Sequence, residues 1–405
     1  MNRNQLILLI IIGAVVGGIG YNLSRREQAT WSQSAQKMGE KLLPDFDVNK
    51  VESINIKSQT NTLTLTRQND IWVVAERGGY PANFSSIQDF LLKVRDLKIA
   101  QPVKAGAGQL ARLELVAPSS ATNSGTLVDF KDKGGKSITT LLLGKKHMKD
   151  SPGGGQFGGG GWPDGRYVMA GGDTKNVALV AEALANAEPK GEEWLDKDFL
   201  KVEKLRSIAV TSQQSSNSWA MSRESENGEW KLAEAKPTEH VDAGKTSALN
   251  YLLNSPSFHD VAGSDQKPED TGLDKPLVAK LQTFDGFTYT VKVGKANAES
   301  RYFVQFATAA EIPKDRTVGK DEKPEDKEKL DKEFKDKVQK LQEKLKKEQV
   351  HDKWTYLVDK WSIDNLLKER REFMADKKDE SKGDDSKAPA PAPGLPPGLE
   401  LPKLN

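Results

Sequence analysis

The stretch Asp70–Ser85 reads DIWVVAERGGYPANFS, and Gly228–Asp242 reads GEWKLAEAKPTEHVD. In both, a tryptophan opens a short alternating run that ends in Ala-Glu, a break containing proline follows, and an apolar stretch with helical spacing comes next. The distance between the two copies is that of a whole domain, whereas the repeats of a solenoid are only about 20–50 residues long. The pattern predicts that one folded domain occurs twice in the chain.

The same order of elements surrounds both stretches. Before each tryptophan lie runs with the period-2 alternation of half-buried strands, and after it comes a helix that begins at Asn83 or Ser85 in the first copy and at Asp242 in the second. Further matched segments are Leu141–Lys145 with Val291–Lys295, Arg166–Val168 with Arg301–Phe303, and Trp194 with Trp361. The sequence therefore predicts an α+β fold of two homologous, mainly antiparallel sheet-plus-helix domains, at residues 45–203 and 204–375.

An uncharged apolar segment lies at residues 6–23, LILLIIIGAVVGGIGYNL. As a helix it spans roughly 27 Å, close to the roughly 30 Å of a bilayer core. We expect a single-pass transmembrane anchor within residues 1–23 that contacts membrane lipid, followed by a juxtamembrane stalk at residues 24–44. A cleaved signal peptide is the alternative, although Gly18–Gly20 is a poor cleavage site. We place the body on the periplasmic side of a bacterial inner membrane.

A charged insert at residues 313–350 carries one apolar stripe at helical spacing. The stripe consists of Leu330, Phe334, Val338, Leu341 and Leu345. It predicts a helical arm that packs back on Ile363–Met374 or, alternatively, presents the stripe to another chain; we prefer packing, because a short stripe rarely sustains a coiled coil alone. Beyond the second domain, residues 376–405 are charged and then rich in proline, which predicts a disordered tail with polyproline II character.

The composition argues against several classes of function. The 405-residue chain has 60 basic and 58 acidic side chains, so no overall positive field attracts nucleic acid. It has no cysteine, which excludes disulfides and thiol nucleophiles. The glycine-rich run 153–161 lacks the ending of a phosphate-binding loop, the four histidines are widely separated, and no GxSxG motif occurs. We therefore predict no catalytic residue, no cofactor, no metal site and no enzymatic activity, with an uncharacterised enzyme as the less favoured alternative.

Trp162 and Trp354 are among the tryptophans that have no partner in the repeat. Tryptophan is enriched at binding hot spots, so both are candidates for a binding surface, as is the apolar stripe of the insert. An envelope polymer such as cell-wall glycan is the ligand that this alternative suggests.

The paired strand–strand–Trp-strand–helix units, the strand that ends in Leu-Gly-Lys, the Arg-Tyr strand and the N-terminal anchor resemble the bacterial domain-of-unknown-function family 4340. The resemblance covers residues 45–200 and 205–370. It implies a membrane-anchored extracytoplasmic protein associated with an ABC-type transport system of the gliding-motility kind. We accordingly expect a non-catalytic accessory or scaffold subunit of an envelope transport or motility machine, with transporter subunits as partners, and the sequence leaves its oligomeric state open.

Overall fold

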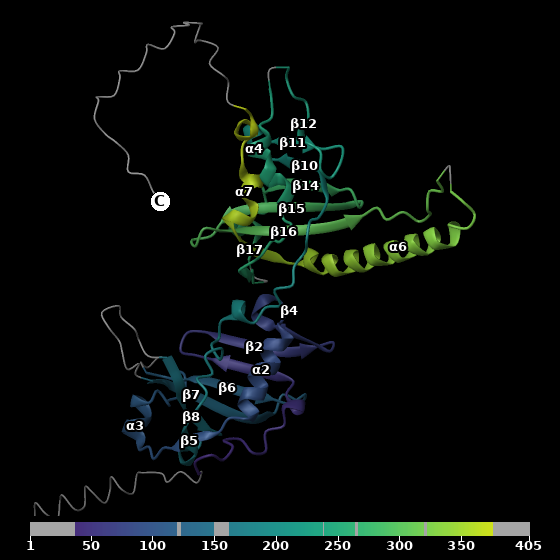
Figure 1. Cartoon of the computed structure of the whole chain (residues 1–405). Helices are drawn as coiled ribbons and strands as arrows, with labels where there is room; N and C mark the ends of the chain where they lie inside the picture. The colour runs from purple at the N-terminus through teal and green to yellow at the C-terminus, as the bar shows by residue number, and fades with distance from the viewer. Residues whose placement is uncertain are drawn as a thin grey trace, which may run out of the picture.

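The computed structural model describes residues 37–119, 123–149, 162–237, 239–263, 266–319 and 322–375. They form two antiparallel sheets with a few helices, one sheet beyond the other along the molecule (Figure 1). The α+β class predicted from the sequence is confirmed. The predicted anchor at residues 6–23, most of the stalk and the tail at residues 376–405 lie outside the described ranges. Within those ranges no helix is long and apolar enough to cross a membrane.

The first sheet has nine strands in the order β4-β3-β2-β1-β6-β7-β8-β9-β5. Its central strands bury alternate residues because successive side chains point to opposite faces; in β1, Ile54 and Ile56 are fully buried and their neighbours are not. The strands are β1 (Ser53–Lys57), β2 (Thr62–Gln68), β3 (Ile71–Val74), β4 (Tyr80–Pro81), β5 (Ile99–Pro102), β6 (Thr126–Lys131), β7 (Ser137–Lys149), β8 (Trp162–Ala170) and β9 (Val177–Val180).

The second sheet has eight strands in the order β12-β11-β10-β14-β15-β16-β17-β13. Two-residue strands form both of its edges. The strands are β10 (Leu205–Thr211), β11 (Trp219–Ser222), β12 (Lys231–Leu232), β13 (Asp260–Val261), β14 (Leu277–Thr283), β15 (Phe287–Ala296), β16 (Arg301–Ala310) and β17 (Thr355–Asp359). We call residues 37–203 the first unit and residues 204–375 the second unit.

The helices are few and mostly short. The α-helices are α2 (Phe84–Arg95), α3 (Ala107–Arg112), α4 (Ala243–Thr246), α5 (Pro268–Thr271), α6 (Lys327–Gln349) and α7 (Lys360–Leu367). The 3-10 helices are η1 (Val48–Lys50), η2 (Ala75–Arg77), η3 (Thr174–Asn176), η4 (Gly191–Glu193), η5 (Ser215–Asn217), η6 (Ser247–Tyr251), η7 (Val350–Lys353) and η8 (Arg370–Phe373).

The predicted helix starts are both present. The Asn83 side chain accepts a hydrogen bond from Ser86 N at 3.0 Å, and Asp242 accepts one from Gly244 N at 2.7 Å. These caps satisfy amide groups that have no partner inside the helix. The helix after Asp242 is shorter than its apolar pattern suggests, because α4 passes into η6 and leaves Tyr251 73% exposed.

The two sheets have the same strand order once β3-β2-β1 is matched with β12-β11-β10 and β6-β7-β8-β9-β5 with β14-β15-β16-β17-β13. Their registers also agree. Ile54 of β1 pairs with Leu65 of β2, as Ile208 of β10 pairs with Met221 of β11. A register shift also follows Leu143 in one sheet and Val293 in the other.

Glycine is required at the Gly-Lys pair of each unit because the chain crosses the strand closely there. A Cβ on Gly144 would lie 2.2 Å from the carbonyl oxygen of Leu113, just after α3. A Cβ on Gly294 would lie 2.2 Å from the carbonyl oxygen of Thr271, the last residue of α5. Both distances are shorter than any side chain tolerates, so the same packing constraint explains the repeated motif.

The match between Trp194 and Trp361 does not hold in space. Trp194 is buried, and its carbonyl oxygen accepts a hydrogen bond from Asn83 N at 2.8 Å. Phe373 takes the corresponding place in the second unit, where its carbonyl oxygen accepts from Asp242 N at 3.0 Å and its ring is fully buried. Trp361 is 67% exposed on α7. The predicted match, which relied on equal spacing along the sequence, therefore paired the core residue Trp194 with the surface residue Trp361.

The Arg-Tyr match is displaced by one residue. Arg166 pairs with Lys146 across the sheet, whereas Tyr302 pairs with Ala296 at the equivalent point of the second sheet. Arg166 is buried and donates to the Gly144 carbonyl at 2.8 Å, while Arg301 pairs with the half-exposed Asp359. The two arginines therefore have different roles.

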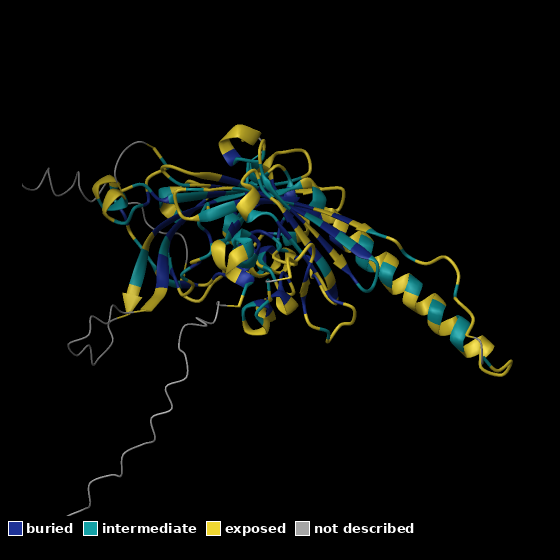
Figure 2. Ribbon diagram, turned by 90° about the horizontal axis from the view of Figure 1, so that it is seen from above, coloured by how far each residue is buried: buried dark blue, intermediate teal, exposed yellow. Residues whose placement is uncertain are grey.

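The arm is the helix α6, which projects from the body beyond the end of β16 (Figures 1 and 2). Leu341 and Leu345 pack on the core, and the outer stripe residues Leu330, Phe334 and Val338 are half-buried. The preceding segment returns along the helix, where Arg316 pairs with Asp331 at 2.7 Å and also with Glu322. The arm packs against β16, while the predicted partner Ile363–Met374 packs on β17 and α4.

The base of α6 is fastened to the segment that joins the units. Glu348 is buried there, and its carboxylate accepts from Tyr289 Oη at 2.7 Å and from Lys201 N at 3.3 Å. Burial raises the pKa of Glu348. Lys347 pairs with Asp198 at 2.7 Å. The arm is thus held at its inner end by the connecting segment.

The two units meet near β4 of the first sheet and β13 and β17 of the second. Arg77 forms a two-pronged ion pair with Asp260, with N–O distances of 2.7 and 2.8 Å. The ring of Tyr80 contacts those of Phe258, Trp354 and Tyr356 at centroid distances of 5.1 to 6.0 Å. Edge-to-face aromatic contacts of this kind add to the free energy gained from burial alone.

The connecting segment closes this junction with Phe199. Its ring lies 4.7 Å from that of Tyr356 and 5.1 Å from that of His351. The buried residues of both units form one continuous core through these contacts, and the dark blue residues in Figure 2 accordingly fill the centre of the molecule. The two predicted domains are joined by packed side chains as well as by the chain itself.

Candidate binding groove

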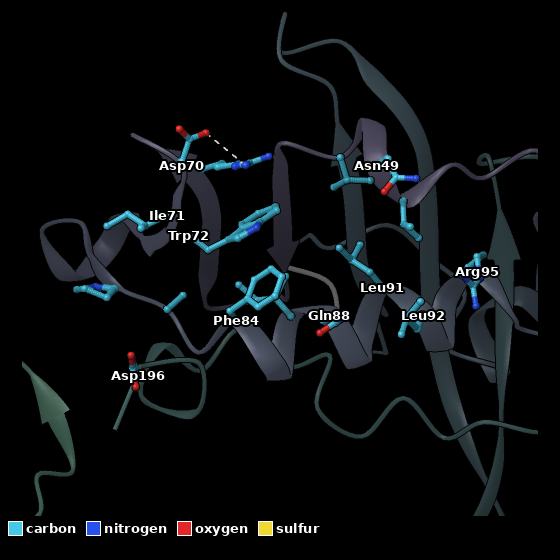
Figure 3. A pocket seen from close by; sticks show the side chains of 16 residues that line it. Asn49, Asp70, Ile71, Trp72, Phe84, Gln88, Leu91, Leu92, Arg95 and Asp196 are labelled. Atoms are coloured by element: carbon cyan, nitrogen blue, oxygen red, sulfur yellow. Dashed lines mark hydrogen bonds and ion pairs between the residues drawn. The ribbon is translucent and has the colours of Figure 1, made fainter. Parts of the chain in front are cut away.

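An open groove of about 860 Å³ lies on the first unit beside Trp72. Figure 3 shows it between β3, which carries Ile71 and Trp72, and α2, which carries Phe84, Gln88, Leu91 and Leu92. Residues of η1 border it near the far end of α2, and Asp196 from the connecting segment borders it near Phe84. We call this the Trp72 groove.

The walls of the groove are apolar and accessible. Ile71 is 53% exposed and Phe84 is 59% exposed, although both are large hydrophobic residues. They flank Trp72, whose ring is mostly covered and forms the base between them (Figure 3). Exposed apolar side chains that gather in one concavity are typical of a binding site, whereas isolated ones carry no such meaning.

Charges of both signs lie at the rim. Arg67 reaches over the groove and pairs with Asp70 at 3.3 Å and with Glu52 at 3.5 Å. At the other end, Arg95 pairs with Asp96 at 2.6 Å, and its hydrogen bond holds the pKa of Asp96 well below the usual range. The rim can therefore pair with either charge on a ligand, while the base offers only apolar surface.

The equivalent place in the second unit is closed. Trp230 donates its indole N–H to Asn250 Oδ1 at 2.9 Å, and the Arg223 guanidinium lies over the Trp230 ring at 4.9 Å. Arg223 also donates to Asn250 at 2.9 Å. Nearby, Val202 N donates to Leu253 O at 2.9 Å, which ties the incoming chain to the helical segment. The side chains that would border a groove here thus contact one another instead.

The groove is lined by both apolar and polar residues, with Gln88 lying among the apolar side chains of α2. Among the described residues no cluster of three or more His, Asp or Glu side chains could hold a metal ion. A long, open apolar groove with charged ends suits an extended chain with apolar side chains.

The residues proposed from sequence as binding residues lie elsewhere. Trp162, at the start of β8, is 79% exposed. Trp354 is half-buried at the junction, where it borders a 410 Å³ cavity between the units and contacts Tyr80. The stripe Leu330, Phe334, Val338, Leu341 and Leu345 lies along α6. The structure brings none of these residues into the Trp72 groove.

The sequence analysis did not single out Trp72 or its accessible neighbours as binding residues. Ile71 and Phe84 carried a usable signal. Ile71 is a bulky apolar residue in β3, where the buried positions are Trp72 to Val74. Phe84 is likewise an additional apolar residue in α2, whose buried positions begin at Ile87. Only the folded chain shows that these two positions border one groove.

The sequence model of a domain of unknown function, DUF4340, matches residues 72–276, from β3 to the end of the segment before β14. The chain belongs to this family. The matched region runs through the junction and includes both Trp72 and Trp230. No curated protein and no solved structure matches the chain.

Proposed function

We propose that this DUF4340 protein is a non-catalytic, membrane-anchored binding protein of the cell envelope, and that the Trp72 groove holds an extended apolar segment. The observation that carries this proposal is the contrast between two equivalent places in one chain. The first is open and lined by the exposed Ile71 and Phe84, while the second is closed by Arg223 and Asn250. A groove left open in one copy alone is best explained by a ligand.

We further propose that the two units arose by duplication of one domain. The shared strand order, the matching registers, the two helix caps and the two close glycine contacts support it. After duplication, one copy can keep a binding site while the same site in the other copy is filled by packed side chains. The closed place of the second unit fits such a division.

The proposed anchor rests on the sequence, and the proposed partner rests on the family resemblance alone. Residues 6–23 are apolar over the length of a bilayer core. The resemblance of the chain to its family suggests that the body is periplasmic and lies at the inner membrane beside an ABC-type transporter. We propose that a transporter subunit, or an associated motility component, is the partner. The chain then acts as an accessory or scaffold subunit.

Photo-crosslinking tests this function. A photoreactive amino acid replaces Phe84 in the full chain, and irradiation of intact cells is followed by identification of the captured protein. We expect a permease or ATP-binding transporter subunit to be captured at position 84 and not at the control position 251, which is as exposed but lies on the second unit. Repeated absence of transporter subunits from the position-84 products contradicts the proposal.

Binding of cell-wall glycan is the second candidate, and the exposure of Trp162 favours it. A tryptophan that is 79% exposed offers a flat face on which a sugar ring can stack. Replacing Trp162 with alanine should then lower retention of the protein on isolated cell wall, with Trp361→Ala as an equally exposed control. Unchanged retention removes this candidate.

A further inference from the structure

We propose that the Trp72 groove binds the proline-rich end of this same chain, residues 388–405, in an extended polyproline II conformation. This inference rests on the proposed function, since it names the chemistry of the segment that the groove holds. The groove and the tail belong to one molecule, so the tail occupies the groove until a partner displaces it.

The chemistry of the groove fits such a segment. Proline-rich chains bind in shallow grooves lined by aromatic side chains, because their backbone is already extended and loses little entropy on binding. The Trp72 groove offers the exposed Phe84 and Ile71 beside the largely covered Trp72. Leu91 and Leu92 extend this apolar lining along α2, where proline and leucine side chains can pack.

The tail has two parts of different composition. Residues 376–387 read DKKDESKGDDSK, which is almost entirely polar and charged, whereas residues 388–405 read APAPAPGLPPGLELPKLN. The second part holds only one acid, Glu400, and one base, Lys403. The rim of the groove presents Arg67 and Asp70, which can pair with either of them. The apolar segment thus follows a charged spacer that has no affinity for an apolar groove.

The spacer is long enough to reach. The described chain ends at Ala375, where the amide of Ala375 donates to His240 O and Met374 pairs with Val241, beyond the β12 edge of the second sheet. The eight strands of that sheet are spaced by about 4.8 Å, so crossing it takes roughly 34 Å, and continuing to β3 takes roughly 45 Å in all. Residues 376–394 in polyproline II geometry span roughly 60 Å.

The stoichiometry also agrees. Each chain has one tail and one open groove, because the equivalent place in the second unit is closed by Arg223 and Asn250. A tether of this length gives the tail an effective concentration near the groove of about a millimolar. Modest intrinsic affinity is therefore sufficient for occupation, and it does not depend on protein concentration.

The test uses the purified full chain in mild detergent, with the photoreactive amino acid in place of Phe84. After irradiation, peptides are identified by mass spectrometry, and the electrophoretic mobility shows whether the link lies within one chain. We expect a link from position 84 to residues 388–405 in the monomer band. The yield should be unchanged over a hundred-fold range of concentration and should fall at least ten-fold in the variant L395S/P396S/P397S.

Two controls make the result decisive. The same amino acid at position 251 should give no link to the tail, and the variant S381A/S386A in the spacer should leave the yield unchanged. Absence of a tail link, an equal yield from position 251, or a link found only in a dimer band overturns the inference. If position 84 links to a transporter subunit in cells but never to the tail in the purified chain, the inference fails while the proposed function stands.

Discussion

Trp72 and Trp230 occupy corresponding positions in the two units. Val74, two residues after Trp72, pairs with Leu65, and Leu232, two residues after Trp230, pairs with Met221. Yet one borders an open groove, and the other is enclosed by an arginine and an asparagine. The strand order and the register agree in both places, but β3 includes Trp72 whereas β12 begins after Trp230, and α2 stands where α4 passes into η6. The side chains around the indole differ as well.

One further difference lies on the helical segment. Leu91 of α2 and Asn250 of η6 stand at the same offset from the capping residues Asn83 and Asp242, but Leu91 is buried and Asn250 is exposed. Asn250 accepts hydrogen bonds from both the indole and the arginine of the second unit. Leucine offers no acceptor, so in the first unit Arg67 turns outward to Asp70 instead. The first unit therefore lacks the amide that joins the indole and the arginine in the second unit.

The largest expected effect is at the enclosed tryptophan. Trp230→Ala should lower the free energy of unfolding by about 3–5 kcal/mol, because it removes a large buried side chain that packs against Arg223. Trp72→Ala should cost less, since one side of its ring already borders open space. Urea unfolding of the two variants of the full chain measures both values. An equal loss in the two variants contradicts the distinction between the sites.

A smaller loss is expected at Asn250. Asn250→Leu imitates the first unit and leaves the indole of Trp230 and one amino group of Arg223 without an acceptor. Asn250 is exposed and both hydrogen bonds are only partly buried, so water can replace the lost acceptor in part and the loss should be about 0.5–1.5 kcal/mol. The exposed Asn254→Leu is the matched control and should change the free energy of unfolding by no more than about 0.5 kcal/mol. Similar values for the two variants would show that the amide does not hold the place closed.

A pH effect should distinguish the junction from the groove. Burial lowers the pKa of His351 below its ordinary value of 6.5, against the opposing influence of Asp198 and Asp196. The unfolded chain therefore gains a proton below about pH 6.5 that the folded chain does not bind, so stability falls as the pH decreases through this range. His351→Gln should reduce this fall, whereas His240→Gln, at an exposed histidine, should leave it in place. Unfolding curves between pH 7 and pH 5 measure the difference.

The smallest expected effect on stability is at the wall of the groove. Phe84→Ser removes a side chain that is 59% exposed, so the free energy of unfolding should change by about 0.5 kcal/mol or less. The same variant should lose binding of a synthetic peptide with the sequence of residues 388–405, measured by fluorescence anisotropy on the chain with the L395S/P396S/P397S tail. Retained peptide binding would mean that Phe84 is not part of the binding surface.

The sequence predicted the α+β class, the two helix starts and the Gly-Lys correspondence, because each depends on residues that act locally or repeat with a fixed period. It missed the pairing of Trp194 with Phe373, since that depends on where a distant segment returns to the sheet. The packing of the arm on β16 was missed for the same reason. The Trp72 groove was missed because Ile71 and Phe84 are separated by a turn whose geometry no local pattern specifies.

The chain enters the described body beside β5, where Gly39 N donates to Ile99 O, and leaves it beside β12 at Ala375. These are the opposite outer edges of the two sheets, so the strands lie across the line that joins the ends (Figure 1). Tension applied between the ends would peel the ladders apart one hydrogen bond at a time, without shearing many bonds together. The molecule should therefore yield at low mechanical force, as an extensible tether does.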